Sequence, residues 1–315
     1  MKKAEGDNLY IGIHDKYNHC FEDVMMTYMF FENIPYVYMY ADAWKFYSDV
    51  NIIDEFGGCE YKCSYPHEEA IQNIIGIKIK KIECLKEENI NKLLEQNKIL
   101  VIHYDAMYCD WSIAYQKYHL QHYFILNKVE NGIIQGNDPY LSKIQIQLSL
   151  DELRKNNGQV FMWEMDSSFD DSNKRKILKM IMQINDSMFE QIKAFGEKIG
   201  KVNVYNYGRE YKQDMTACPM YQKITYVVNS RYNLSKVFYY VSVKEKKETY
   251  KEIARDFFNV ATLWEEVKGN IIRLTMNQVL CLKNSNKVKE MIYKISDAEE
   301  TIYNNLIKII DIKEK

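Results

Sequence analysis

The spacing of apolar residues changes near the middle of the chain, and this change limits the folds available to the sequence. Residues 143–148 (KIQIQL) alternate apolar and polar side chains, which is typical of a strand with one buried face. Amphipathic helices, with apolar residues three or four apart, are instead predicted at 175–199, 250–267 and 288–309. The polar stretch 166–174 separates the two patterns. We therefore expect an α+β domain over residues 1–165 and a helical domain over residues 166–315 that completes a substrate cleft.

The first half carries the signals of a small antiparallel sheet. Apolar or alternating runs of strand length occupy 77–82, 99–104, 122–129 and 143–148. Asn131-Gly132 is a strong signal for a tight hairpin turn, because both residues tolerate the positive φ angles that such turns need. The strand after this turn begins at Ile133 and ends at Asn137-Asp138, just before Pro139. The sheet is thus predicted to include a hairpin centred on this turn.

Helices are also expected in the first half. The spacing of apolar residues predicts a helix over residues 20–32, with Asn18 as a candidate N-cap. Residues 86–97 indicate a short polar helix. Residues 201–218 are irregular, and we expect a loop there that covers the site.

Charge and composition exclude several classes of function. Lys and Arg total 42 and Asp and Glu total 44, so no general basic field indicates a nucleic-acid partner. No apolar run approaches the ~18–20 residues of a membrane helix, and the first ten residues lack the apolar core of a signal peptide. The seven cysteines are odd in number and scattered. We expect a cytoplasmic protein with reduced thiols and no membrane partner.

Three residues far apart in the sequence form a candidate catalytic set. Cys20 opens the first predicted helix, where free backbone N–H groups and the helix dipole favour an anionic sulfur. His122 opens a predicted strand, and Asp138 ends the strand across the hairpin turn. In such a hairpin the two side chains lie near the same end of the strand pair. A carboxylate can then orient one imidazole nitrogen while the other nitrogen faces the sulfur.

The segments that carry these residues resemble the N-terminal domain of the butirosin biosynthesis protein H family. The resembling segments are NHCFEDVMMTYMFF, VIHYDAMYCDWSIAYQKYHLQHYFILNKV and IIQGNDPY. The resemblance covers roughly residues 10–165, and family members often have a helical C-terminal region with a Trp-containing helix like that around Trp264. The family consists of papain-like cysteine enzymes. The resemblance implies a papain-like fold, with Cys20 as nucleophile, His122 as base and Asp138 as the orienting carboxylate.

Other positions are less firmly assigned by the resemblance. Papain-like enzymes often carry an oxyanion-stabilising Gln six residues before the cysteine, and His14 occupies that position here. Either His14 donates in its place, or the backbone N–H of the cysteine acts with some other group. His119 is interpreted as a supporting residue, and His122 is preferred as the base because it opens the strand beside the hairpin. Asp105 and Tyr115 are candidate substrate-binding residues, with a loop anchor as the alternative role of Asp105.

The resemblance also implies a reaction. The founding activity of the family moves an acyl group from a carrier-protein thioester onto an amine, which forms an amide. For this chain it implies an acyl-Cys20 intermediate, an acyl or peptidyl carrier protein and an amine-bearing small molecule as partners, and a setting in nonribosomal peptide, antibiotic or other specialised-metabolite biosynthesis. No cofactor is expected beyond the phosphopantetheine of the carrier, and no metal.

Three alternatives remain open from the sequence. The first is a cysteine peptidase or hydrolase with the same three residues, and the second is a non-enzymatic module that binds a carrier protein or a metabolite. The third is a zinc protein, because Cys59, Cys63 and His67 form a C-x3-C-x3-H pattern. That pattern resembles half of a zinc site, but no second pair follows at a suitable spacing.

Overall fold

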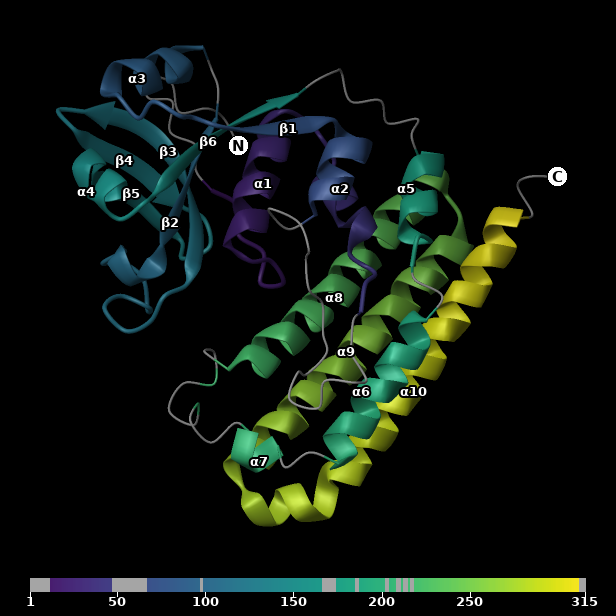
Figure 1. Cartoon of the computed structure of the whole chain (residues 1–315). Coiled ribbons are helices and arrows are strands. Elements are labelled where there is room, and N and C mark those ends of the chain that lie inside the picture. The colour runs from purple at the N-terminus through teal and green to yellow at the C-terminus, as the bar shows by residue number, and fades with distance from the viewer. Residues whose placement is uncertain are drawn as a thin grey trace. The chain divides into compact units, whose positions relative to one another are not determined.

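In the computed structural model the chain forms two compact units (Figure 1). The structure describes residues 12–46, 67–96, 99–165, 174–184, 187–201, 204–207, 211, 215 and 218–311. The first unit comprises Met1–Tyr38 and Ile71–Ser172, and the second comprises Met39–Ala70 and Asn173–Lys315. The expected division at residue 165 placed all of the first 165 residues together, whereas the structure assigns Met39–Ala70 to the helical unit.

An antiparallel six-stranded sheet is the frame of the first unit. The strands are β1 (Ile77–Lys81), β2 (Leu100–Asp105), β3 (Gln121–Glu130), β4 (Ile133–Asp138), β5 (Lys143–Ser149) and β6 (Gln159–Met165). Their order in the sheet is β1-β6-β2-β3-β4-β5, and every neighbouring pair is antiparallel. The α+β class and the five strands predicted from the sequence are confirmed.

Strand β6 was not predicted, because its sequence does not alternate. Val160 belongs to one buried cluster and Met162 packs against that cluster. Trp163 is buried among aromatic rings on the other side of the sheet. A strand covered on both faces has no polar face, and so it lacks the period-two signal.

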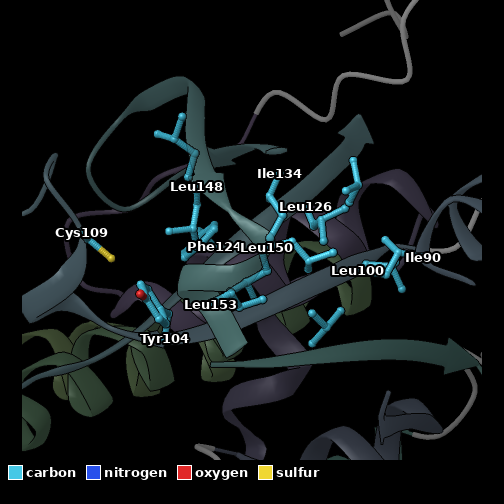
Figure 2. Close-up of a cluster of buried hydrophobic side chains, with 14 residues drawn as sticks. Ile90, Leu100, Tyr104, Cys109, Phe124, Leu126, Ile134, Leu148, Leu150 and Leu153 are labelled. Carbon is cyan, nitrogen blue, oxygen red and sulfur yellow. The ribbon is translucent and has the colours of Figure 1, made fainter. Parts of the chain in front are cut away.

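Helices cover both faces of this sheet. Helix α1 (Cys20–Phe31) packs against β3, where Phe21 meets the rings of Tyr123 and Trp163 edge-on and Tyr28 meets Trp163. The alternate residues of the same strands form a buried cluster with side chains from α3 (Glu87–Glu95) and α4 (Leu150–Lys155) (Figure 2). Its members include Ile90, Leu100, Phe124, Leu126, Leu150 and Leu153.

A β-bulge in β3 decides which face of the sheet carries Asp138. The paired residues are Glu130 and Ile133 on the turn side of the bulge, and Ile125 and Asn137 beyond it. The bulge at Asn127 therefore shifts the register by one residue, and such a shift reverses the face of every later side chain. In the shifted register Asp138 falls opposite Phe124, on the face that also carries His122. Without the shift it would fall opposite Ile125, on the other face.

The second unit is built from helices. They are α5 (Lys174–Ile181), α6 (Met188–Lys201), α7 (Val204–Tyr207), α8 (Pro219–Glu245), α9 (Glu248–Met276) and α10 (Gln278–Asp311). Helices α8 and α9 pack together, and α10 packs against both α6 and α9. None of the described helices combines the length and the apolar content needed to cross a bilayer. Shorter helical segments in the chain are η1 (Tyr36–Asp42), α2 (Glu68–Ala70), η2 (Ile71–Ile75) and η3 (Ala106–Tyr108).

The second unit differs from the sequence analysis at three places. The predicted helix 175–199 is two helices, α5 and α6. The three- and four-residue spacing of apolar residues continues from one helix into the next, so the sequence pattern does not show the break. Helix α8 was not predicted, because its buried residues include Asn229, Ser230 and Arg231 and so form no simple apolar stripe. The predicted loop 201–218 contains the short helix α7, and much of it lies outside the described residues.

A buried carboxylate ties the residues after η1 to the helices. Glu299 of α10 accepts hydrogen bonds from the indole nitrogens of Trp44 (2.8 Å) and Trp264 (2.9 Å). It also accepts two from Arg231 of α8, from Nε at 3.0 Å and Nη2 at 2.8 Å. Arg231 Nη1 donates in turn to the carbonyl oxygen of Lys45 (2.9 Å). These contacts are the physical reason why that segment belongs to the helical unit.

Removing the cation of this network is expected to destabilise the protein strongly. The side chains of Arg231 and Glu299 are both fully buried, so Arg231→Met leaves a buried carboxylate without its cation, at a cost of about 3–5 kcal/mol. The free energy of unfolding from urea titration measures the loss. Lys251→Met, which removes an exposed ion pair with Glu248, is the matched control and should change stability by less than about 1 kcal/mol. Equal losses in the two variants would contradict this account.

Candidate active site

Cys20 is the first residue of α1, and its side chain is partly exposed. The N-cap is His19 and not Asn18 as expected; the backbone N–H of His19 donates to the Glu22 carboxylate at 2.6 Å, in a capping box. Asn18 is buried instead. The Cys20 sulfur lies 3.9 Å from the carbonyl oxygen of Gln121, the first residue of β3. The helix thus places a partly exposed thiol beside the start of the strand that carries His122.

The structure joins His122 to Asp138. His122 Nε2 donates to Asp138 Oδ2 at 2.5 Å, and both side chains are buried. The contact connects β3 to the end of β4 on the face set by the bulge at Asn127. Because Nε2 is bonded to the carboxylate, Nδ1 is the ring nitrogen available to a third group.

The Cys20 thiol is that third group. Burial alone lowers the pKa of His122, but hydrogen bonds to Asp138 and Cys20, with the charges of both groups, outweigh burial and raise the pKa to about 10. A protonated imidazole between a carboxylate and a sulfur favours the thiolate, the reactive form of cysteine. The structure therefore brings the three predicted residues Cys20, His122 and Asp138 together.

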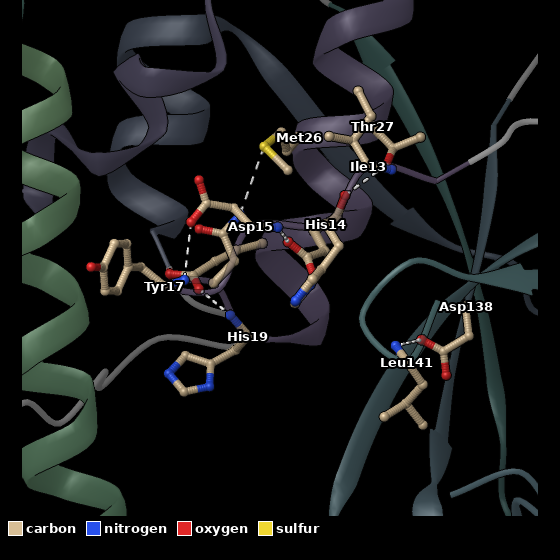
Figure 3. Close-up of polar contacts among 12 residues, drawn as sticks. Ile13, His14, Asp15, Tyr17, His19, Met26, Thr27, Asp138 and Leu141 are labelled. Atoms are coloured by element: carbon tan, nitrogen blue, oxygen red, sulfur yellow. Dashed lines mark hydrogen bonds and ion pairs between the residues drawn. The ribbon is translucent and has the colours of Figure 1, made fainter. Parts of the chain in front are cut away.

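Two further donors hold the Asp138 carboxylate. Trp111 Nε1 donates to Oδ2 at 2.9 Å, and the backbone N–H of Leu141 donates to Oδ1 at 3.1 Å (Figure 3 draws the second contact). The Trp111 ring also packs edge-on against Phe124 of the buried cluster. Sequence reasoning did not single out Trp111. It lies inside one of the segments that carry the family resemblance, but nothing in its spacing indicates a donor to Asp138.

His14, the candidate oxyanion donor, is bound to the helix that carries Cys20. His14 Nδ1 donates to Asp23 Oδ2 at 2.6 Å, and the backbone N–H of Asp15 donates to Asp23 Oδ1 at 3.1 Å. Burial raises the pKa of Asp23 to about 6, although the contacts with His14 and Asp15 act against burial. This contact uses Nδ1, so the predicted oxyanion contact of His14 would have to come from Nε2.

Tyr140 lies between the two histidine–aspartate pairs and was not predicted. Its ring centroid is 5.8 Å from that of His14 and 6.5 Å from that of His122, with both contacts edge-on. Burial raises the pKa of its phenol, and the charges of Cys20 and Asp23 add to the shift. Tyr140 therefore lies close enough to the Cys20 sulfur to feel its charge, and it contacts the rings of both histidines.

The segment before α1 is held against both halves of the site. The backbone N–H of Ile13 donates to Thr27 Oγ1 in α1 at 2.9 Å (Figure 3). A side chain at Gly12 would overlap Pro139, which follows Asp138, so only glycine allows this approach. This packing explains how His14 comes to lie beside Tyr140.

Asp105 and His119 form a separate pair at the base of the loop between β2 and β3. His119 Nδ1 donates to Asp105 Oδ2 at 2.5 Å, and the backbone N–H groups of Met107 and Leu120 donate to Oδ1 at 3.0 and 3.1 Å. Burial raises the pKa of Asp105, but these hydrogen bonds outweigh it and lower the pKa overall. The contacts match the loop-anchor role for Asp105. Substrate binding by Asp105 or by Tyr115, a partly exposed residue of the loop, stays a prediction.

Other thiols and the zinc pattern differ from the Cys20 site. Cys109 is fully buried, and burial, followed by nearby negative charges, raises the pKa of its thiol, which disfavours the reactive thiolate. Cys59 and Cys63 lie outside the described residues. His67 is buried and donates through Nδ1 to Asp42 Oδ1 at 2.7 Å. Among the described ranges of the chain, no group of three or more His, Cys, Asp or Glu residues is placed to hold a metal ion.

The chain matches no protein-family model, and the search of curated proteins finds no match.

The raised pKa of His122 predicts that its ring keeps its proton well above neutral pH. In an NMR titration of the histidine ring signals, assigned with His122→Gln, the His122 signals should move at a pH far above 6.5, near 10. Asp138→Asn removes the carboxylate and should lower this midpoint by one unit or more. A wild-type midpoint at or below 6.5 would contradict the proposed environment of the ring.

Proposed function

We propose that the protein is a cysteine-dependent acyltransferase with a papain-like fold, which forms an amide by way of an acyl-Cys20 intermediate. The observation that carries this proposal is the contact series from Cys20 to His122 to Asp138. A helix bearing the cysteine, packed on an antiparallel sheet bearing the histidine and the aspartate, is the arrangement that the papain-like resemblance implies.

The first half-reaction loads the enzyme. The Cys20 thiolate attacks the carbonyl carbon of an acyl thioester, and the tetrahedral oxyanion accepts hydrogen bonds from the Cys20 backbone N–H and from His14. The bond between this carbon and the pantetheine sulfur then breaks. The departing sulfur takes the proton of the His122 imidazolium, which leaves acyl-Cys20, a free pantetheine thiol and a neutral imidazole.

The second half-reaction makes the amide. The nitrogen of an amine attacks the acyl-Cys20 carbonyl carbon, and neutral His122 accepts the proton that this nitrogen loses. The carbon–sulfur bond to Cys20 then breaks, which restores the thiolate and the imidazolium. Asp138 holds the imidazole through Nε2, so Nδ1 faces the reacting atoms in both half-reactions.

This chemistry indicates the partners and the setting. Conversion of a thioester to an amide is downhill, so no nucleotide or other cofactor is needed. A thioester on the phosphopantetheine of an acyl or peptidyl carrier protein is the donor, and an amine-bearing small molecule is the acceptor. We place the reaction in the cytoplasmic biosynthesis of a specialised metabolite, the setting that the family resemblance implies, and water must be kept from the acyl-cysteine there.

An intact-mass experiment with acyl-pantetheine thioesters tests the proposal. The wild-type protein should gain one acyl group, and a small amine should release it as the amide faster than water releases it as the acid. Cys20→Ala should gain none, because it lacks the nucleophile. Cys84→Ala, which removes an exposed cysteine, is the matched control and should behave like the wild type.

Other results would reject or redirect the assignment. An adduct that persists in Cys20→Ala would reject Cys20 as the nucleophile. Release of the acyl group at the same rate with and without amine, together with cleavage of peptides, would favour the peptidase or hydrolase alternative, which uses the same three residues. Complete absence of an adduct and of hydrolysis with every thioester would favour the binding module.

A further inference from the structure

We propose that Trp111 is a positioning residue for the reaction, acting through Asp138. This inference rests on the proposed function, because it assigns a role within the same site. Trp111 belongs to residues 106–120, which connect β2 to β3, and it contributes the only side-chain N–H bonded to Asp138 besides that of His122 among the contacts of the described residues.

Trp111 and His122 share one oxygen of the carboxylate. Asp138 Oδ2 accepts from His122 Nε2 at 2.5 Å and from Trp111 Nε1 at 2.9 Å, while Oδ1 accepts from the backbone N–H of Leu141 at 3.1 Å. Two donors on one oxygen and one donor on the other fix both the position and the plane of the carboxylate. These hydrogen bonds hold the carboxylate in a single orientation toward the His122 imidazole.

The burial of Asp138 makes the indole contact important. The Asp138 side chain has no exposed surface, so water cannot replace a missing donor without entering the protein. A buried carboxylate needs donors to compensate for its lost hydration. The indole N–H supplies one without adding a charge that would compete with the imidazolium for Asp138.

The loop that carries Trp111 is closed at its base. The backbone N–H of Ala106 donates to the carbonyl oxygen of Leu120 at 2.8 Å, and Asp105 accepts from the backbone N–H groups of Met107 and Leu120. Within the loop, the backbone N–H of Gln116 donates to the carbonyl oxygen of Met107 at 3.0 Å. These hydrogen bonds hold the loop in one conformation, which explains how Trp111, far from Asp138 in the sequence, reaches the Asp138 carboxylate.

A double-mutant cycle on Cys20 alkylation tests this role and needs no knowledge of the natural substrate. The rate of alkylation by iodoacetamide at pH 7 is measured at Cys20 by peptide mass mapping, in the wild type, Trp111→Phe, Asp138→Asn and the double variant. Trp111→Phe keeps the ring packed on Phe124 but removes the N–H. It should slow alkylation roughly 3- to 10-fold in the wild-type background, and less than ~2-fold in the Asp138→Asn background.

Two controls separate positioning from folding. Trp264→Phe likewise removes an indole N–H from a buried carboxylate, Glu299 of the helical unit, and should leave the alkylation rate within ~2-fold of the wild type. The free energy of unfolding of each variant is measured in parallel. If Trp111→Phe unfolds the protein, Trp111→His, which keeps a ring N–H, is the second variant and should retain more of the rate than Trp111→Leu.

The outcomes distinguish this inference from the proposed function. An unchanged rate in Trp111→Phe, or the same slowing in both backgrounds, would overturn the positioning role. His122→Gln is included as a further arm. If the wild type and His122→Gln react at the same rate, then the sulfur does not depend on the imidazole, and the proposed function itself fails.

Discussion

The hydrogen bond between His122 and Asp138 depends on one extra residue in a strand. Asn127 shifts the register of the β3–β4 hairpin, and the shift turns Asp138 to the face that carries His122. Gly136 makes the close strand approach possible there, because any side chain at that position would overlap the carbonyl oxygen of Ile125. A regular hairpin of the same sequence would keep its turn and still separate the carboxylate from the imidazole.

The second requirement is a sulfur at the correct end of a helix. Aromatic contacts of Phe21 and Tyr28 with Tyr123 and Trp163 fix α1 on the sheet, so the first residue of the helix lies beside the start of β3. The imidazole then has a carboxylate on one nitrogen and a thiol on the other. This environment raises the pKa of His122 despite burial, which would act in the opposite direction. The charge distribution that the proposed acyl transfer needs thus follows from contacts made within one compact unit.

The local parts of this arrangement could be predicted from the sequence, and the long-range parts could not. The hairpin signal of Asn131-Gly132 and the helical spacing after Cys20 are short-range patterns, and both elements are present. The contact of Trp111 with Asp138 and that of Trp44 with Glu299 join loops to elements distant in the sequence. No periodic pattern of apolar residues predicts such contacts. The one-residue error in the N-cap of α1 has a local cause.

That cause is competition between two neighbouring polar residues. Asn18 is buried, while His19 takes the capping position with Glu22.

Strand β6 and helix α8 escaped prediction for a different reason. The strand is covered on both faces, and the buried face of the helix includes polar side chains such as Arg231, so neither follows the simple apolar pattern on which sequence reasoning relies.

The central claim is that the sulfur of Cys20 accepts an acyl group because His122 and Asp138 act on it together. The most direct measurement is the single-turnover rate of acylation by one acyl-pantetheine thioester at saturating concentration, in the wild type, His122→Gln and Asp138→Asn. The account predicts a loss on the order of 100-fold or more for His122→Gln and a loss on the order of 10-fold or more for Asp138→Asn. Equal acylation rates in all three proteins would show that the sulfur reacts on its own, and the account would be contradicted.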